Sequence, residues 1–227
     1  FEANYDFAKA KSAFIFKTIV DPFIGKYSFV KVCSGVLKGD DVLYNPESDA
    51  EAKIGKIYTL SGNKPVEVPE LFAGDIGAIA KLTSTKTGDT LSTRNTPVSY
   101  GRTEYSKPYT YMKYVVNNKG DEDKVSQALA KMMAEDVTLK VVNDSENRQS
   151  LIYGMGDQHL EVTASKLAER YKVGIRLETP KVAFRETIRK NSDVDTKYKK
   201  QSGGHGQYGH VKMRFEPSGD LDTPYVF

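Results

Sequence analysis

The sequence predicts a multidomain β and α+β fold: a β-barrel, a ferredoxin-like split β-α-β domain, and the truncated, β-rich start of a third domain. Three observations predict it. Residues 1–97 alternate short aromatic and β-branched runs with glycine turns, residues 98–179 alternate strand and helix patterns, and strand patterns return from residue 180. We therefore place the domains at residues 1–97, 98–179 (including a linker) and 180–227.

The first domain reads as a series of short strands. Separators such as Gly39-Asp40 and Gly74-Asp75 recur between them, the segment DPFIGK at 21–26 makes a turn, and no stretch has a helical period. Short strands at this spacing predict a closed barrel. The predicted strands are 13–19, 27–33, 41–44, 53–60, 65–68 and 75–80.

The middle domain begins after a polar linker at 92–108, which contains two prolines. Asp121 is a candidate cap for a first helix, and two glycines at 154 and 156 open a second helix, in which we expect His159 to pack or hydrogen-bond rather than catalyse. With strands at 109–116, 139–142, 150–153 and 174–177, the order is β-α-β-β-α-β, the split βαβ arrangement. The apolar positions expected in the helix cores are Val125, Ala128, Leu129, Met132, Met133, Leu160, Ala164, Leu167 and Tyr171.

The third segment carries the strongest functional signal, the run KKQSGGHGQYGHV at 199–211. Because four glycines fall within seven positions, we expect a tightly bending loop that no helix or strand interior would accept. Its other side chains are cationic, amide, hydroxyl or planar, which suits contact with phosphate and unpaired bases. A glycine-rich turn joining two strands is the alternative interpretation. The candidate RNA- or ribosome-binding residues are Lys199, Lys200, Gln201, Ser202, Gly203, Gly204, His205, Gly206, Gln207, Tyr208, Gly209 and His210.

Strands are expected on both sides of this loop. Val182, Phe184 and Ile188 fall on one face before it, and apolar residues alternate with Lys212 and Arg214 after it.

The positive charge is concentrated in the same segment. Residues 1–97 hold 12 Lys/Arg and 12 Asp/Glu, residues 98–179 again hold 12 and 12, and residues 180–227 hold 9 and 6. Between Lys181 and Arg214 the count is 9 basic against 3 acidic residues. The formal net charge of +3 therefore comes from the segment with the glycines, which favours an anionic partner.

Several function classes are excluded or disfavoured. No apolar run approaches the roughly 18 residues needed to cross a bilayer, so we expect no membrane partner. The single cysteine, Cys33, is expected to be a small buried residue in a reducing, cytoplasmic compartment. The chain has no G-x-x-x-x-G-K-[ST], G-x-S-x-G or H-E-x-x-H motif, so we predict no cofactor and no catalytic residue in it. An enzyme that uses His205 and His210 as acid or base is the weakest hypothesis. Because no cysteine lies near these two histidines, we predict no zinc site there.

The order and spacing of short motifs over the whole chain resemble elongation factor G, a translational GTPase family. The matching motifs are Asp21-Pro22-Phe23-Ile24-Gly25, Ser34-Gly35-Val36, Gly39-Asp40, Ala73-Gly74-Asp75-Ile76, Thr87-Gly88-Asp89-Thr90-Leu91, Ala134-Glu135-Asp136, Gly154-Met155-Gly156, His159-Leu160-Glu161, Pro180 to Ile188 and Lys200 to His210. They resemble the family's second and third domains and the start of its fourth.

The resemblance implies a fragment of a longer, cytoplasmic ribosomal translocation factor, an interpretation that fits a chain beginning with Phe1. In that parent a preceding GTPase domain would bind GTP and Mg, and the partners would be that domain, ribosomal RNA, and the tRNA and mRNA at the decoding region. The residues matching the fourth domain's tip loop are 202–208.

The chain departs from the family pattern at three places. Val137 stands where proline is common, Asp157-Gln158 where Glu-Leu is usual, and His205 where arginine is frequent. Histidine in place of arginine exchanges a permanent cation for a group that titrates near neutrality. A paralogue such as a ribosomal protection protein, or a nucleotide-independent RNA-binding module, therefore stands as an alternative.

Overall fold

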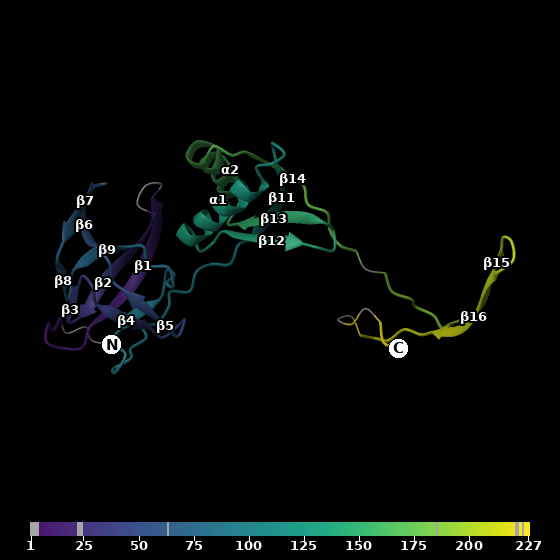
Figure 1. Ribbon diagram of the computed structural model, residues 1–227, viewed down its shortest axis with the longest axis horizontal. Coiled ribbons are helices and arrows are strands. Elements are labelled where there is room, and N and C mark those ends of the chain that lie inside the picture. Colours follow the sequence, from purple (N-terminus) through teal and green to yellow (C-terminus); the bar gives the residue numbers. More distant parts are fainter. Residues whose placement is uncertain (1–4, 22–24, 63, 185, 221–222, 224) are drawn as a thin grey trace. The chain divides into compact units, whose positions relative to one another are not determined.

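The chain divides into two units, Phe1–Lys181 and Val182–Phe227, which are described separately. The computed structural model describes residues 5–21, 25–62, 64–184, 186–220, 223 and 225–227 (Figure 1). Of the turn expected at 21–26, residues 22–24 lie outside the described residues. Across the described part of the chain, no helix is long and apolar enough to span a membrane.

The first part of unit 1 is an antiparallel sheet of eight strands in the order β5-β4-β10-β1-β2-β9-β6-β7. A two-stranded ribbon, β3 (Val36–Lys38) with β8 (Glu70–Phe72), accompanies it. The eight strands are β1 (Ser12–Asp21), β2 (Gly25–Ser34), β4 (Val42–Asn45), β5 (Ala50–Lys53), β6 (Ile57–Ser61), β7 (Lys64–Val68), β9 (Ile76–Ala80) and β10 (Thr90–Ser92).

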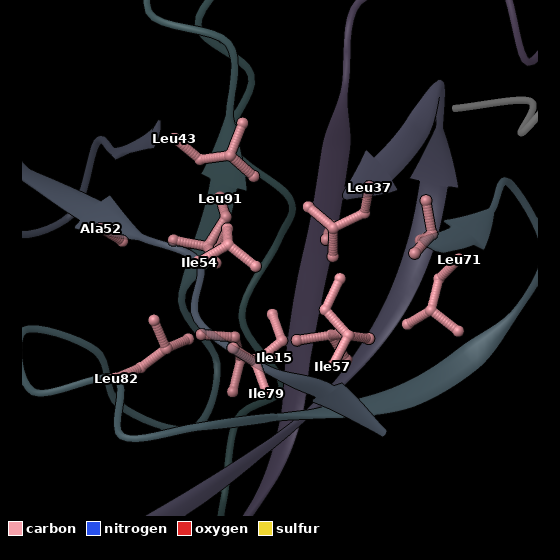
Figure 2. Packing of buried hydrophobic residues seen from close by; sticks show 13 residues of the cluster. Ile15, Leu37, Leu43, Ala52, Ile54, Ile57, Leu71, Ile79, Leu82 and Leu91 are labelled. Atoms are coloured by element: carbon pink, nitrogen blue, oxygen red, sulfur yellow. The ribbon is translucent and has the colours of Figure 1, made fainter. Parts of the chain in front are cut away.

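One apolar core lies inside this sheet. Ile15, Ile57 and Ile79 are fully buried and their side chains converge in Figure 2. Ala52 of end strand β5 belongs to the same cluster, and Val68 of the other end strand, β7, packs against it. Because both ends of the sheet contribute to one core, the sheet wraps around that core, as the predicted barrel requires.

Several predictions for this part of the chain fail. The single strand predicted at 53–60 is wrong, because Gly55 lies between β5 and β6 in a stretch without strand structure. The short strands β3, β8 and β10 were not predicted, and β5 shares only Lys53 with the predicted strand 53–60. Cys33 is half-buried rather than buried, and that partial burial is the main cause that raises the pKa of its thiol.

The second part of unit 1 has the predicted β-α-β-β-α-β order. Its elements are β11 (Thr110–Val116), α1 (Glu122–Glu135), β12 (Lys140–Asp144), β13 (Gln149–Gly154), α2 (Asp157–Tyr171) and β14 (Ile175–Glu178). The sheet runs in the order β12-β13-β11-β14 with all neighbours antiparallel. The buried faces of both helices share one apolar cluster with Met112, Tyr114 and Val116 of β11, so the helices cover one face of the sheet.

Side chains near the starts of both helices make hydrogen bonds, but the expected cap of α1 does not form. Asp121 occupies the N-cap position of α1, but it makes no capping bond and instead accepts hydrogen bonds from Lys124 and Asn118. His159 has the predicted hydrogen-bonding role: its Nδ1 accepts the Met155 N–H (3.0 Å), and its Nε2 lies 3.0 Å from the Asp136 carboxylate. Because Nδ1 is an acceptor, we infer that Nε2 carries the proton given to Asp136.

Unit 2 contains one hairpin, formed by β15 (Ser192–Gln201) and β16 (Gly206–Phe215). The alternation seen from Val211 to Phe215 is confirmed as strand. The strand expected over 180–188 is wrong, because the described residues there have no regular secondary structure, and their side chains are mostly exposed, so no buried face favours an extended pairing.

Candidate nucleic-acid interface

The candidate residues form the closed end of the β15–β16 hairpin. Lys199 pairs with Tyr208, Lys200 with Gln207 and Gln201 with Gly206 in an unbroken register. Only residues 202–205 connect the strands. The hairpin therefore brings together all twelve candidate residues, but it holds eight of them in hydrogen-bonded strands: Lys199, Lys200, Gln201, Gly206, Gln207, Tyr208, Gly209 and His210.

The expectation that no strand would accept these glycines is wrong. Gly206 and Gly209 lie within β16, and a Cβ added at Gly209 would meet no atom within 4 Å. These strands have no buried side to fill, so a missing side chain leaves no cavity there. Only Gly203 uses glycine's conformational freedom, with a φ of +84°.

Charges are segregated along the hairpin. At the open end, Asp195 contacts His210 and, at 3.1 Å, Lys212, while Arg214 lies 2.7 Å from Glu216. Toward the closed end, Lys197, Lys199 and Lys200 are exposed and have no ion pair among the described residues. The unneutralised cations are thus gathered beside the four-residue connection, where a polyanion can approach.

The register also separates two chemically different faces. Val194 pairs with Met213 and Thr196 with Val211, which puts these mostly apolar side chains on one face. Lys197 and Lys199 alternate with them and belong to the opposite face, together with Tyr208. Tyr208 is 67% exposed and directly opposite Lys199, so an aromatic ring and a cation are presented side by side. That combination suits a ribose-phosphate chain with unpaired bases.

The histidines of this site have different surroundings. His205 lies in the connection and is exposed, and His210 contacts Asp195. No group of three His, Cys, Asp or Glu side chains among the described residues could hold a metal ion.

A barrel followed by a split βαβ domain and a basic hairpin defines a multidomain protein of the translation-factor type. Comparison with known families gives the same domains in the same order. Residues 10–94 match the family model described as Elongation factor G domain 2, residues 106–179 match Elongation Factor G, domain III, and residues 180–227 match Elongation factor G, domain IV. The chain belongs to the elongation factor G family and comprises domains II, III and the start of domain IV.

A solved structure supports this assignment. The crystal structure of a protein from Thermus thermophilus is 32% identical in sequence, with a TM-score of 0.75 over 91% of this chain. The chain covers 31% of that protein, so it spans about a third of its length. None of the matched domains is a GTPase domain.

Proposed function

We propose that this chain is the ribosome-contacting middle part of a translocation factor whose complete form hydrolyses GTP. The observation that carries the proposal is the set of lysines without an ion pair among the described residues, Lys197, Lys199 and Lys200, which lie toward the closed end of a hairpin with an unbroken register. In the family, domain IV reaches the decoding region during movement of tRNA and mRNA. The hairpin therefore supplies cations where a factor of this kind meets RNA.

GTP and Mg belong to the preceding GTPase domain of such a parent, and the residues of this chain do not fit them. The sequence has no G-x-x-x-x-G-K-[ST] segment, so it lacks the loop that cradles the phosphates in P-loop proteins. We assign no residue of this chain to nucleotide binding. Its part is to bind the ribosome and to connect the nucleotide-binding domain with the decoding region.

The RNA contact is tested by the salt dependence of ribosome binding. Each phosphate contact contributes roughly one unit to the slope of log K against log salt. Lys199→Ala with Lys200→Ala should therefore weaken binding to ribosomes and reduce the slope by about two units. The matched control is Lys212→Ala with Arg214→Ala, which removes the same charge from the acid-paired end of the same hairpin. Equal slopes for the two double variants would refute the hairpin tip as the RNA contact.

The GTPase part of the proposal has its own test in the source gene. Translation of the reading frame upstream of the Phe1 codon should reveal an in-frame G-x-x-x-x-G-K-[ST] domain. A frame that opens close to Phe1 would refute the GTPase parent and favour a nucleotide-independent RNA-binding module instead.

A further inference from the structure

The sheet of the split βαβ domain has one face that the helices do not cover. Met112, Tyr114 and Val116 of β11 pack into the core beneath the helices. Because side chains alternate along a strand, Tyr111 and Lys113 belong to the opposite, open face.

Two tyrosines stack on this open face. Tyr111 of β11 and Tyr153 of β13 are direct cross-strand partners on the two central strands of the sheet. Their ring centroids lie 5.0 Å apart with an interplanar angle of 23°. Tyr111 is 38% exposed and Tyr153 is half-buried, and neither ring belongs to the apolar core beneath the helices. The pair therefore presents aromatic surface to the outside without filling a core.

Cations lie beside the tyrosine pair. Lys140 of β12 is the cross-strand partner of Tyr153 on its other side, is exposed, and has no ion pair among the described residues. Lys113, two residues along from Tyr111, donates to Glu178 at 2.7 Å, and Glu178 also accepts from Arg176. One carboxylate, Glu178, thus faces two cations, while Lys140 has no ion pair among the described residues.

The other end of the same face is closed. Gln149 holds the backbone of Lys181 with two hydrogen bonds, Nε2–H to the carbonyl oxygen (2.7 Å) and Lys181 N–H to Oε1 (2.9 Å). Leu151, between Gln149 and Tyr153 on this face, is 6% exposed. The accessible surface is therefore confined to the end that carries the tyrosine pair and Lys140, which we name the tyrosine platform.

We propose that the tyrosine platform binds unpaired nucleotides of RNA, with bases stacked on Tyr111 and Tyr153 and a phosphate near Lys140. A four-stranded sheet with aromatic rings on its central strands is the arrangement by which RNA-recognition domains stack two or three bases. Strand β13, QSLIYG, does not carry the sequence signature of those domains, so the geometry alone supports the assignment. The platform is a second RNA contact, in a different unit from the hairpin, and does not depend on the hairpin's function.

The test is a binding titration of the whole chain with a 5′-fluorescein-labelled, 12-nucleotide RNA that cannot pair with itself, followed by fluorescence polarisation. A base stacked on one aromatic side chain contributes substantially to the binding free energy. Tyr111→Ala and Tyr153→Ala should therefore each weaken RNA binding by about 5- to 100-fold. Tyr111→Phe and Tyr153→Phe keep the rings and should bind within about twofold of the unchanged chain. A 12-base-pair duplex should bind all of these variants alike, because its bases are not free to stack.

Phe72→Ala is the matched control, because Phe72 is similarly exposed (41%) and belongs to another ring pair, with Phe7 in the barrel. Equal loss in Phe72→Ala, or unchanged single-strand binding in both Tyr→Ala variants whose amide spectra remain folded, would overturn the platform. If a Tyr→Ala variant does not fold, the Tyr→Phe variants and Lys140→Ala test the platform instead. Lys140→Ala must then lower the slope of log K against log salt for single-stranded RNA. This test is independent of the proposed function. The Tyr→Ala variants can leave RNA binding unchanged while the Lys199/Lys200 variant lowers the salt dependence of ribosome binding, or the reverse can occur.

Discussion

A buried carboxylate holds the turn before β10 against the rest of the barrel. Asp89 is 3% exposed, and its Oδ2 accepts hydrogen bonds from Asn45 Nδ2 and Lys86 N–H, both at 2.9 Å. Its Oδ1 accepts from Arg102 at 2.6 Å, which fastens the segment after the barrel as well. Its backbone carbonyl accepts the N–H of Ile15 in β1. Removal of the Asp89 side chain should therefore loosen three places at once: β4 at Asn45, the turn at Lys86 and the later segment at Arg102.

Asp89→Ala should lower the free energy of unfolding of the barrel by about 3–5 kcal/mol. Each hydrogen bond to a buried charged group contributes about 1.5–3 kcal/mol, and the contribution of Arg102 is discounted because that side chain is 55% exposed. Asn45 is fully buried, and the change leaves its Nδ2 donor with a 3.3 Å bond to the Ser84 carbonyl as its remaining bond among the described residues. These losses are of the size expected when one partner of a buried charged network is removed.

Native-state hydrogen exchange measures this change within the barrel alone, so that unfolding of the other domains does not obscure it. The Ile15 amide should exchange about a hundred- to a few thousand-fold faster in Asp89→Ala. Glu67→Ala is the control, because the Glu67–Lys56 pair is exposed on both sides and should change stability by less than about 1 kcal/mol. A shift below about 1 kcal/mol in Asp89→Ala would refute the view that this carboxylate holds the barrel together.

Three further predictions concern other parts of the chain. Burial raises the pKa of Asp136, but hydrogen bonds from Thr138 and His159 outweigh burial and lower the pKa overall. Asp136 therefore stabilises domain III at pH values above its unfolded pKa, and this contribution is lost as the pH falls through its folded pKa. Asp136→Asn should make the acid unfolding curve, measured by circular dichroism, flatter below about pH 4. Gly203→Ala should weaken the hairpin by about 1 kcal/mol because of the positive φ, seen as lost cross-strand NOEs, whereas Gly209→Ala should keep them. Gln149→Ala should speed exchange of the Lys181 amide by about tenfold, and an unchanged rate would refute the clamp.

Periodicity predicted the elements whose buried side chains repeat regularly. Val125, Leu129 and Met132 of α1 are buried at helical spacing, and in β1 the buried Ala13 and Ile15 are separated by the half-buried Phe14. Three of the missed strands, β3, β8 and β10, are three residues long, and β3 and β8 pair with each other across a long stretch of chain. Three residues show no period, so their pairing could not be predicted locally. The ten-residue strand β15 was also missed, because its side chains are all exposed and give no buried face to recognise.

The predicted linker is more ordered than its composition indicates. Tyr100 donates its N–H to the Thr90 hydroxyl and shares a 2.7 Å hydrogen bond between hydroxyls with Ser12. Arg102 reaches the buried Asp89. Polar composition and prolines predict irregular backbone correctly here, but they say nothing about whether that backbone is free. The hydrogen-bond partners decide that: Thr90 and Asp89 lie 10 and 13 residues back along the chain, and Ser12 of β1 lies 88 residues back.

The two candidate RNA contacts differ in how far the sequence reveals them. Charge counting finds the hairpin, because Lys199 and Lys200 are adjacent and lack acidic neighbours in the sequence. The platform cannot be found that way, since Tyr111 and Tyr153 meet only through the β11–β13 register. A shift of one residue in that register would turn one ring into the core. Stacking surfaces on sheets are therefore a property of register, and only a folded structure shows them.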